Sequence, residues 1–323
     1  MSVLVTGGTG FVGTHIVAQL AALGERVVAL SSEGELDETA RDLLGQAAVA
    51  KVTCVKADVL DLDALCEVLE NHAVDRIIHG AAVTAIGDLE SEAARSAALV
   101  NVGGTATVLE AARLAGVTRF IHLSSASVYG ATDPAVPLEE TVPLAPSGIY
   151  GITKRAGEEI VRRYFELFGM SGVILRLSAP YGPLERPNPL RTVMSPVFEW
   201  CRAALNGDEV ELADDLERDL TYVADAARCV VLALRKQHLK YHVYNASCGE
   251  NLRFSDILAA LARVRPGFRF RRKEGGSLSP FFRASLRGPL SMKRAREELG
   301  FEPRYDIERG LGRYLEWLER HPL

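Results

Sequence analysis

The sequence lacks an excess of basic residues, a long apolar run and a leader-like beginning. It contains 37 Lys+Arg and 42 Asp+Glu among 323 residues, a formal net charge of −5, so we expect no nucleic-acid partner. No stretch reaches about 18 consecutive apolar residues, so we expect no membrane span. No basic segment precedes an apolar run at the start, so we expect no signal peptide. Small molecules, anionic ones included, remain as the expected ligands.

Paired cysteine and metal-ligand motifs are also absent. The five cysteines are scattered and form no CxxC pair, which is typical of a reduced, cytoplasmic protein. The seven histidines include no HExxH motif and no spacing suited to zinc. We therefore expect no metal site.

Short β-branched runs alternate with longer helical stretches in the first half of the chain. The apolar runs are nearly continuous, as expected when helices cover both faces of a parallel sheet. The alternating order predicts crossover connections and a doubly wound α/β fold. The predicted strands are Val3–Thr6, Arg26–Leu30, Val52–Lys56, Arg76–His79, Arg119–Ser124 and Gly172–Leu177. The predicted helices are Phe11–Leu23, Leu62–Asn71, Ala93–Ala115 and Tyr150–Phe168.

The second half of the chain has a different sequence pattern. A proline-rich loop, Ser178–Pro189, separates it from the first half. We expect a Rossmann domain over 1–177, with 219–240 returning to it. The smaller substrate-binding lobe is expected over 178–218 and 241–323, capping the carboxyl edge of the sheet. The elements predicted here are helices Met194–Leu205, Val223–Lys236, Lys293–Leu299 and Ile307–Arg320, a strand His242–Ala246 and a basic segment Arg269–Gly288.

Glycines cluster directly after the first predicted strand. Gly8, Gly10 and Gly13 match G-x-G-x-x-G, Gly7 begins a wider match, and a helix follows at once. Missing side chains let the backbone approach a pyrophosphate, and a helix start offers free N–H groups. The strand–turn–helix context therefore predicts a Rossmann-type dinucleotide site. The residues expected to bind the cofactor here are Gly7, Gly10, Phe11, Val12 and Gly13.

The residues after the second and third predicted strands bear on the cofactor's identity. The dinucleotide fingerprint places an acidic residue after the second strand, to hold the ribose hydroxyls, whereas this chain has Ser31 and Ser32. No arginine follows directly to receive a 2′-phosphate, so NAD is favoured and NADP is not excluded. Asp58, beside Val59, suits an adenine amino group or a helix N-terminus equally well. All four residues are candidate cofactor contacts.

Tyr150 and Lys154 form the main candidate for chemistry. Four residues apart on a helix, they lie on one face, and Ser147 is a candidate cap for that helix. A tyrosine ordinarily has a pKa of about 10, which a fixed cation would lower, so Tyr150 could act as a base. Hydroxyls in Ser124–Gly130, after the fifth predicted strand, face the same crevice.

These motifs together resemble the extended short-chain dehydrogenase/reductase family, specifically its nucleoside-diphosphate-sugar epimerase branch. The resemblance spans nearly the whole chain in the right order. The motifs that carry it are Thr6–Gly13 (TGGTGFVG), Asp58, His79–Ala82 (HGAA), Asn101–Thr105 (NVGGT), Ser124–Gly130 (SSASVYG), Tyr150–Lys154 (YGITK), Tyr181–Pro183 (YGP), Arg218–Ala227 (RDLTYVADAA), Val243–Glu250 (VYNASCGE) and Leu299–Leu311 (LGFEPRYDIERGL).

The resemblance implies roles for individual residues near the nicotinamide. Tyr150 would be the catalytic base or acid, Lys154 its activator and ribose ligand, and Ser125 the hydroxyl that polarises the substrate oxygen. Asn101 would hold the active-site helix and its water, with a buried helix amide as the alternative. The other cofactor contacts implied by the resemblance are Ala81, Ala82, Asn101 and Pro180.

The resemblance also implies a substrate site in the second half of the chain. Arg218 occupies the family position that contacts a diphosphate, with an ordinary salt bridge as the competing interpretation. Its planar guanidinium matches phosphate oxygens. Arg283 and Arg287 lie near the place of a second phosphate-binding arginine, of which we take Arg283 as the candidate. Arg186, in the loop after the sixth strand, and Ser127 are further candidate substrate contacts.

Two departures from the family pattern bear on the reaction. The dehydratase branch has an Asp-Glu pair where this chain has Ala126 and Ser127, which disfavours dehydration. Epimerases of this type carry an asparagine where this chain has Ala179, which weakens the nucleotide-sugar assignment. We therefore favour an NAD-dependent epimerase acting on a nucleotide sugar, similar to UDP-glucose 4-epimerase. The alternatives are a dehydrogenase or reductase of a sugar, sugar acid or other secondary alcohol, and a non-catalytic dinucleotide sensor.

The resemblance further implies a homodimer. The contact would lie on the long helices around Ala93–Ala115 and Gly151–Phe168, whose apolar bias supports this expectation.

Overall fold

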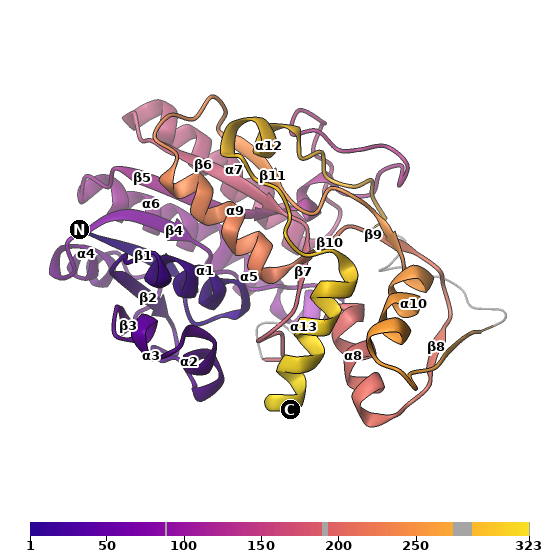
Figure 1. Ribbon diagram of the computed structural model, residues 1–323. Helices are drawn as coiled ribbons and strands as arrows, with labels where there is room; N and C mark the ends of the chain where they lie inside the picture. Colours follow the sequence, from indigo (N-terminus) through magenta and orange to yellow (C-terminus); the bar gives the residue numbers. More distant parts are fainter. Residues whose placement is uncertain (88, 189–192, 274–285, 323) are drawn as a thin grey trace.

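One parallel sheet organises most of the chain (Figure 1). The computed structural model describes residues 1–87, 89–188, 193–273 and 286–322. Its main sheet has seven strands in the order β11-β6-β5-β4-β1-β2-β3, and every neighbouring pair is parallel. The predicted doubly wound α/β fold is therefore confirmed. The strands are β1 (Ser2–Thr6), β2 (Val27–Ser31), β3 (Val52–Lys56), β4 (Val74–His79), β5 (Arg119–Ser125), β6 (Gly172–Leu177) and β11 (Val243–Ala246).

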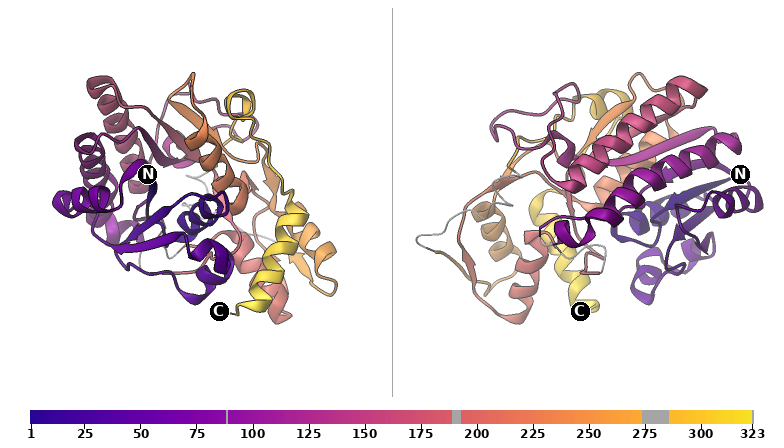
Figure 2. Two further views of the ribbon diagram at one scale, coloured as in Figure 1. Left: turned by 60° about the vertical axis from the view of Figure 1, so that its left-hand side comes forward. Right: turned by 180° about the vertical axis from the view of Figure 1, so that it is seen from behind.

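Helices cover both faces of this sheet. On one face, α1 (Phe11–Ala22) and α9 (Val223–Arg235) pack against each other over the apolar side chains of β1 and β6. On the other face lie α4 (Leu62–Asn71), α6 (Thr105–Leu114) and α7 (Ile149–Phe168). Figure 2 shows this second face from behind, with α6 and α7 side by side across the strands. Coverage on both sides explains why the strands are continuous apolar runs.

Local sequence accounts for where several helices begin and end. The Asp61 side chain accepts a 3.0 Å hydrogen bond from the backbone N–H of Ala64 and so caps α4. Helix α7 ends at Gly169, whose φ of 64° is the left-handed conformation common after a helix. Such signals lie within a few residues of the boundary, so the sequence alone can predict these ends.

The predicted helix Ala93–Ala115 differs in its details. The structure divides it into α5 (Leu89–Ala98), a π-helical segment η1 (Leu99–Gly104) and α6. The π-helical segment contains Asn101, one of the candidate site residues. Such segments are often found at functional sites.

Three further helices were not predicted, namely α2 (Glu38–Leu44), α3 (Gln46–Val49) and α10 (Phe254–Val264).

A second core forms beside the sheet from α8 (Pro196–Asn206), α10 and α13 (Ile307–Arg320). Three short strand pairs accompany it, namely β10 (Leu220–Tyr222) with β7 (Ala179–Tyr181), β12 (Leu252–Arg253) with β9 (Glu217–Arg218), and β13 (Phe270–Arg272) with β8 (Val210–Leu212).

Among the described helices, none is both long and apolar enough to cross a membrane.

The predicted extent of the lobe needs a correction. Residues 243–246 were assigned to it, but as β11 they pair with β6 at the edge of the main sheet. Helix α12 (Lys293–Leu299) also packs on β11 and α9, and its buried residues join the core of the first face. Tyr244 and Ala246 of β11 and Ala295 and Leu299 of α12 are buried apolar residues of this core, so both segments are stabilised by packing with the main sheet. The division of the chain into two domains stays a prediction.

Candidate active site

The candidate site lies where the strand order reverses. From β1 the chain runs outward through β2 and β3, whereas β4, β5 and β6 lie on its other side. In open α/β sheets, ligands bind at the carboxyl ends of the strands that flank such a switch point. Here those strands are β1 and β4, which end at Thr6 and His79.

The glycine turn after β1 is shaped for close backbone approach. Gly7 has a φ of 68°, and a Cβ placed on Gly13 would overlap the carbonyl oxygen of Gly7, so this glycine is needed for α1 to pack on the turn. At Gly10 a Cβ would meet only the Gly7 carbonyl oxygen, at 3.2 Å, and Gly10 caps α1 without a side-chain hydrogen bond. The turn therefore presents open backbone and a helix N-terminus, which fits a dinucleotide pyrophosphate.

A chain of buried hydrogen bonds links the ends of β1 and β4 to the π-helical segment. The Thr105 hydroxyl donates to the backbone carbonyl of Asn101 at 2.6 Å, so it must accept from His79 Nε2, 3.0 Å away. His79 Nδ1 then accepts from the Thr6 hydroxyl at 2.8 Å. Burial first, and the nearby Lys154 charge second, lower the pKa of His79 to about 3. His79 is therefore a neutral structural link between the two strands.

Asn101 connects the loop after β4 to helix α7. Its Oδ1 accepts from the Val83 N–H at 2.8 Å, and its Nδ2 donates to the Val83 carbonyl and to Thr153 Oγ1, both at 3.0 Å. Both amide hydrogens are used within the protein, so a cofactor contact would have to be a hydrogen bond that Oδ1 accepts. The buried amide thus holds the active-site helix; its predicted contact to the cofactor stays a prediction.

The start of α7 packs directly on the segment that carries Ser125 and Ser127. A Cβ on Gly151 would lie only 2.6 Å from the backbone oxygen of Ser127, so Gly151 allows the helix to approach this closely. Ser125 Oγ accepts from the Ser127 N–H and donates to Ser127 Oγ, both at 3.1 Å. Tyr150 is the residue before Gly151, and it is partly buried. The structure therefore brings the predicted serine and tyrosine segments together.

Lys154 lies one turn further along α7 and is buried, with 4% of its surface exposed. Burial lowers the pKa of Lys154 to about 8, against the opposing effect of the Glu158 carboxylate. The charge of Lys154 also lowers the pKa of His79, at the end of β4, and of His122, within β5. The lysine therefore lies close to β4 and β5, and it is one helical turn from Tyr150 on α7.

Two arginines of the smaller core lie close enough to influence each other. Burial lowers the pKa of Arg218, in β9, to about 10. Burial and then the charge of Arg218 lower the pKa of Arg287 to about 10, while Asp219 opposes the shift. The Nε of Arg287 is buried without a hydrogen-bond partner among the described residues. Two partly buried cations in one place are suited to an anion such as a diphosphate.

Other predicted contacts have different surroundings. Arg186 forms a surface ion pair with Asp37, so its guanidinium already has a carboxylate partner. Asp58 accepts from the Leu60 N–H at 2.9 Å, as a turn carboxylate does, and Ser31 Oγ accepts from the Gly34 N–H at 2.9 Å. Arg283 lies outside the described residues. The predicted roles of these residues stay predictions.

Sequence reasoning missed three charged residues that support the site. They are Glu158 and Arg176, which form a buried ion pair behind Lys154 and Ser125, and Glu90, which binds the first N–H of α7. The spacing of Glu158 from Lys154, four residues on a predicted helix, is the signal that could have found one of them.

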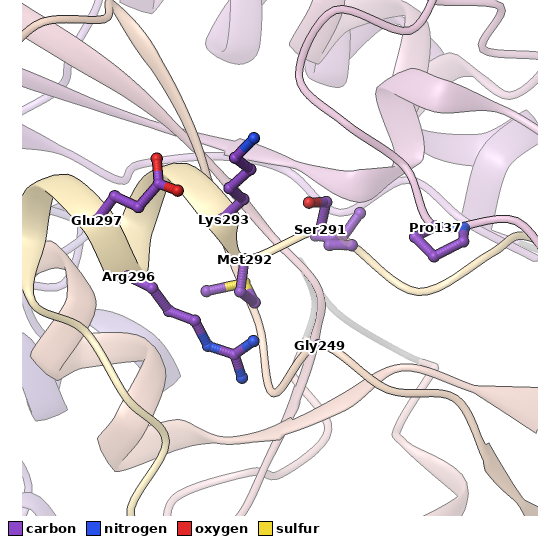
Figure 3. A pocket seen from close by; sticks show the side chains of 8 residues that line it. Pro137, Gly249, Ser291, Met292, Lys293, Arg296 and Glu297 are labelled. Atoms are coloured by element: carbon purple, nitrogen blue, oxygen red, sulfur yellow. The ribbon is translucent and has the colours of Figure 1, made fainter.

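A separate hollow of about 390 Å³ lies beside α12 (Figure 3). None of the predicted catalytic or cofactor residues lines it. Its lining residues are Pro137, Gly249, Leu290, Ser291, Met292, Lys293, Arg296 and Glu297. The chemistry of the protein is therefore to be sought at the strand ends rather than in this hollow.

A glycine turn at the switch point of the sheet, together with a helix that carries a tyrosine and a lysine one turn apart, is typical of a dinucleotide-dependent enzyme. Comparison with known proteins gives the family. A model described as the NAD dependent epimerase/dehydratase family matches residues 3–247. The chain therefore belongs to this family, which confirms the predicted resemblance and the NAD cofactor.

Similar proteins include two different activities. UDP-glucuronate 4-epimerase 1 of Arabidopsis thaliana is 27% identical over 343 residues, covering 98% of this chain and 76% of that protein. dTDP-glucose 4,6-dehydratase of Xanthomonas campestris is 28% identical over 333 residues, covering 97% and 92%. A solved structure of Thermus thermophilus UDP-glucose 4-epimerase in complex with NAD is 26% identical, has a TM-score of 0.81 and covers 100% of both chains.

Proposed function

We propose that the protein is an NAD-dependent epimerase of nucleoside-diphosphate sugars, similar to UDP-glucose 4-epimerase. The observation that carries the proposal is the packing of the helix with Tyr150 and Lys154 on the Ser125–Ser127 segment, at the same edge of the parallel sheet as the glycine turn. UDP-sugar epimerases among the similar proteins support the substrate class.

In the proposed reaction, Tyr150 removes the proton of a sugar hydroxyl and later returns it. The Lys154 ammonium favours the phenolate form of Tyr150 by direct charge interaction, and the Ser125 hydroxyl hydrogen-bonds the same sugar oxygen. NAD, when bound, supplies the acceptor for the hydride of the sugar carbon and then its donor to the other face of the keto sugar. The glycine turn and the start of α1 would hold its pyrophosphate.

The proposed anchor of the substrate is the pair Arg218 and Arg287. Both guanidiniums are partly buried, and the charge of Arg218 lowers the pKa of Arg287. A bound diphosphate would neutralise both and accept charge-assisted hydrogen bonds. Anchoring by the diphosphate would leave the sugar free to turn between the two hydride transfers.

The residues at three positions separate the possible reactions. A dehydratase needs a carboxylic acid after its catalytic hydroxyl, and here Ala126 and Ser127 provide none. The rival dehydrogenase of a sugar, sugar acid or other secondary alcohol would use the same Ser125, Tyr150 and Lys154. It is favoured by Ala179, whose methyl group cannot donate the hydrogen bond that an asparagine would give to a diphosphate.

The test is the variant Tyr150→Phe in NAD-loaded protein. We expect it to retain NAD and to lose about 10²-fold or more in epimerase turnover, because the acid/base group is removed. Tyr164→Phe, a tyrosine further along α7, is the control and should keep wild-type turnover. Wild-type turnover of Tyr150→Phe would exclude the proposed mechanism.

We also propose a homodimer formed through α5, η1, α6 and α7, the elements within the predicted contact helices. Apolar side chains are exposed on these elements, Leu99 at 42% and Ile152 at 46%, and a second copy would bury them. Light scattering should give the dimer mass, and Leu99→Asp with Ile152→Asp should give the monomer. Leu23→Asp, at the end of α1, should leave the dimer intact. A monomeric wild-type protein would contradict the proposal.

A further inference from the structure

Glu158 and Arg176 form a fully buried ion pair beneath the candidate catalytic groups. Glu158 Oε1 accepts from Arg176 Nε at 2.9 Å and Oε2 accepts from Nη2 at 2.7 Å, with 0% and 1% of the two side chains exposed. Such a two-point contact fixes orientation as well as distance. Burying a pair costs so much desolvation that apolar replacements are often equally stable. Stability alone therefore does not explain why the chain has this pair.

The pair holds the segment of Ser125 on both sides. Before Ser125, the Ser124 hydroxyl donates to Glu158 Oε1 at 2.6 Å. After Ser125, Arg176 Nη1 donates to the Tyr129 hydroxyl at 3.0 Å. Tyr129 ends η2 (Ala126–Tyr129), the short helix that follows Ser125 directly. The position of the Ser125 hydroxyl is therefore set from both ends by one ion pair.

The same pair acts on Lys154. Glu158 follows Lys154 by one helical turn, so the two side chains share a face of α7. Its carboxylate raises the pKa of Lys154, opposing the larger effect of burial. Besides Tyr150, one turn earlier on α7, the titratable groups near Lys154 include His79 in β4 and His122 in β5, and burial lowers the pKa of both histidines so that they stay neutral at neutral pH. Glu158 thus supplies negative charge near this ammonium.

We propose that Glu158 and Arg176 are positioning residues for the reaction. They fix the segment that carries Ser125 against the helix that carries Lys154, and the Glu158 carboxylate helps keep Lys154 charged. The inference rests on the proposed function, because it takes Ser125 and Lys154 as the groups that act on substrate.

The main test replaces both charges at once, with Glu158→Leu and Arg176→Met in the NAD-loaded enzyme. The double replacement removes both members of the buried pair together, so neither Glu158 nor Arg176 is left as an unpaired buried charge, and we expect a folded protein with NAD bound. We expect kcat to fall about 10-fold or more, because small displacements of reacting groups have large effects on rate, while KM changes less. The loss of kcat at alkaline pH should begin at lower pH, because Lys154 loses its proton more easily without the carboxylate.

Two further variants complete the test. Ser124→Ala with Tyr129→Phe keeps the ion pair but cuts both links to the Ser125 segment, and it should lower kcat without moving the alkaline limb. Arg162→Met is the matched control, because Arg162 contacts the same carboxylate, at 3.3 Å, with a side chain that is 34% exposed. It should keep wild-type kcat. If the Glu158→Leu, Arg176→Met protein does not fold, the kcat of the Ser124→Ala, Tyr129→Phe protein alone decides whether the ion pair positions Ser125.

Wild-type kcat and pH profile in both double variants would overturn the inference and leave the pair with a structural role only. Tyr150→Phe, measured alongside, separates failure of the positioning role from failure of the proposed function. If Tyr150→Phe loses turnover while the double variants keep it, only the positioning role is wrong. If Tyr150→Phe keeps turnover, the proposed function is wrong as well.

Discussion

Glu90 caps the helix that carries Tyr150: its Oε1 accepts a hydrogen bond of 2.7 Å from the backbone N–H of Ile149, the first residue of α7. The sequence predicted Ser147 as this cap, but Gly148 occupies the cap position and gives no side-chain hydrogen bond. The cap therefore comes from another helix, α5, and it joins two elements that lie far apart in the sequence.

We predict that Glu90→Ala lowers the free energy of unfolding by about 0.5–2 kcal/mol, the usual range for a lost cap. It should also lower turnover, because the first turn of α7 carries Tyr150. Denaturant unfolding and steady-state kinetics measure the two effects. Glu92→Ala, on an exposed residue of the same helix, should change neither. Equal stability of the Glu90 and Glu92 variants would show that the hydrogen bond contributes little.

Much of the fold was predictable because its signals are local. The strands are continuous apolar runs, and the glycine turn directly follows the first of them. Tyr150 and Lys154 could be proposed from their spacing together with Ser124–Gly130. Each of these features is complete within a few residues, so no knowledge of the packing was needed.

The supporting charges could not be predicted in the same way. Glu90 and Arg176 act through partners that are 18 or more residues away in sequence, so only the packed structure shows what they contact. The spacing of Glu158 from Lys154 is visible in the sequence, but its contacts with Arg176 and Ser124 are likewise 18 or more residues away. Arg287 is a similar case, because its nearness to Arg218 depends on how the smaller core folds. The strand β11 was predicted as a strand of the smaller lobe, but it pairs with β6 at the edge of the main sheet, because a short apolar run does not reveal its pairing partner.

The buried histidines predict a loss of stability in acid. Burial lowers the pKa of His15 to about 4 and of His79 to about 3, whereas an unfolded histidine titrates at about 6.5. Below that pH the unfolded state binds protons that the folded state does not, so the free energy of unfolding falls as pH decreases towards 4. The slope is up to about 1.4 kcal/mol per pH unit for each histidine. Chemical denaturation at several pH values measures it.

His122 offers a selective test of that slope. Its pKa is also lowered by burial, and neither ring nitrogen has a hydrogen-bond partner among the described residues. We expect His122→Phe to reduce the acid slope with little loss of stability at pH 7. His79→Phe should instead cost about 1–3 kcal/mol, because it leaves the hydroxyls of Thr6 and Thr105 without their partner. An unchanged slope in His122→Phe would contradict this explanation.

Two glycines of the turn should respond differently to alanine. In Gly13→Ala the new methyl group overlaps the Gly7 carbonyl oxygen, so we expect a large loss of stability. In Gly10→Ala the methyl group makes one tight contact, 3.2 Å from the Gly7 carbonyl oxygen, which a small shift of the turn relieves, so the protein should fold while NAD binds more weakly. Thermal unfolding and calorimetric titration with NAD distinguish the two effects. Wild-type NAD affinity in Gly10→Ala would remove this residue from the proposed pyrophosphate site.

Arg287 should affect substrate binding more than catalysis. We predict that Arg287→Gln raises KM for the nucleotide sugar by about 10- to 100-fold, the loss of a hydrogen bond to a charged group, with a smaller change in kcat. Arg253→Gln is the control, because Arg253 is exposed on β12, next to the strand of Arg218, and pairs with Glu217. Equal KM values for the two variants would exclude Arg287 from the diphosphate site.

The most direct test of the proposed function follows the hydride itself. NAD-loaded protein is incubated with UDP-sugars deuterated at the carbon to be inverted, and the products are observed by NMR while NADH absorbance is recorded. We predict that the epimer forms, keeps its deuterium at the inverted carbon, and is accompanied by no lasting increase in NADH. Accumulation of NADH together with a ketone product, and no epimer, would contradict the account and identify a dehydrogenase.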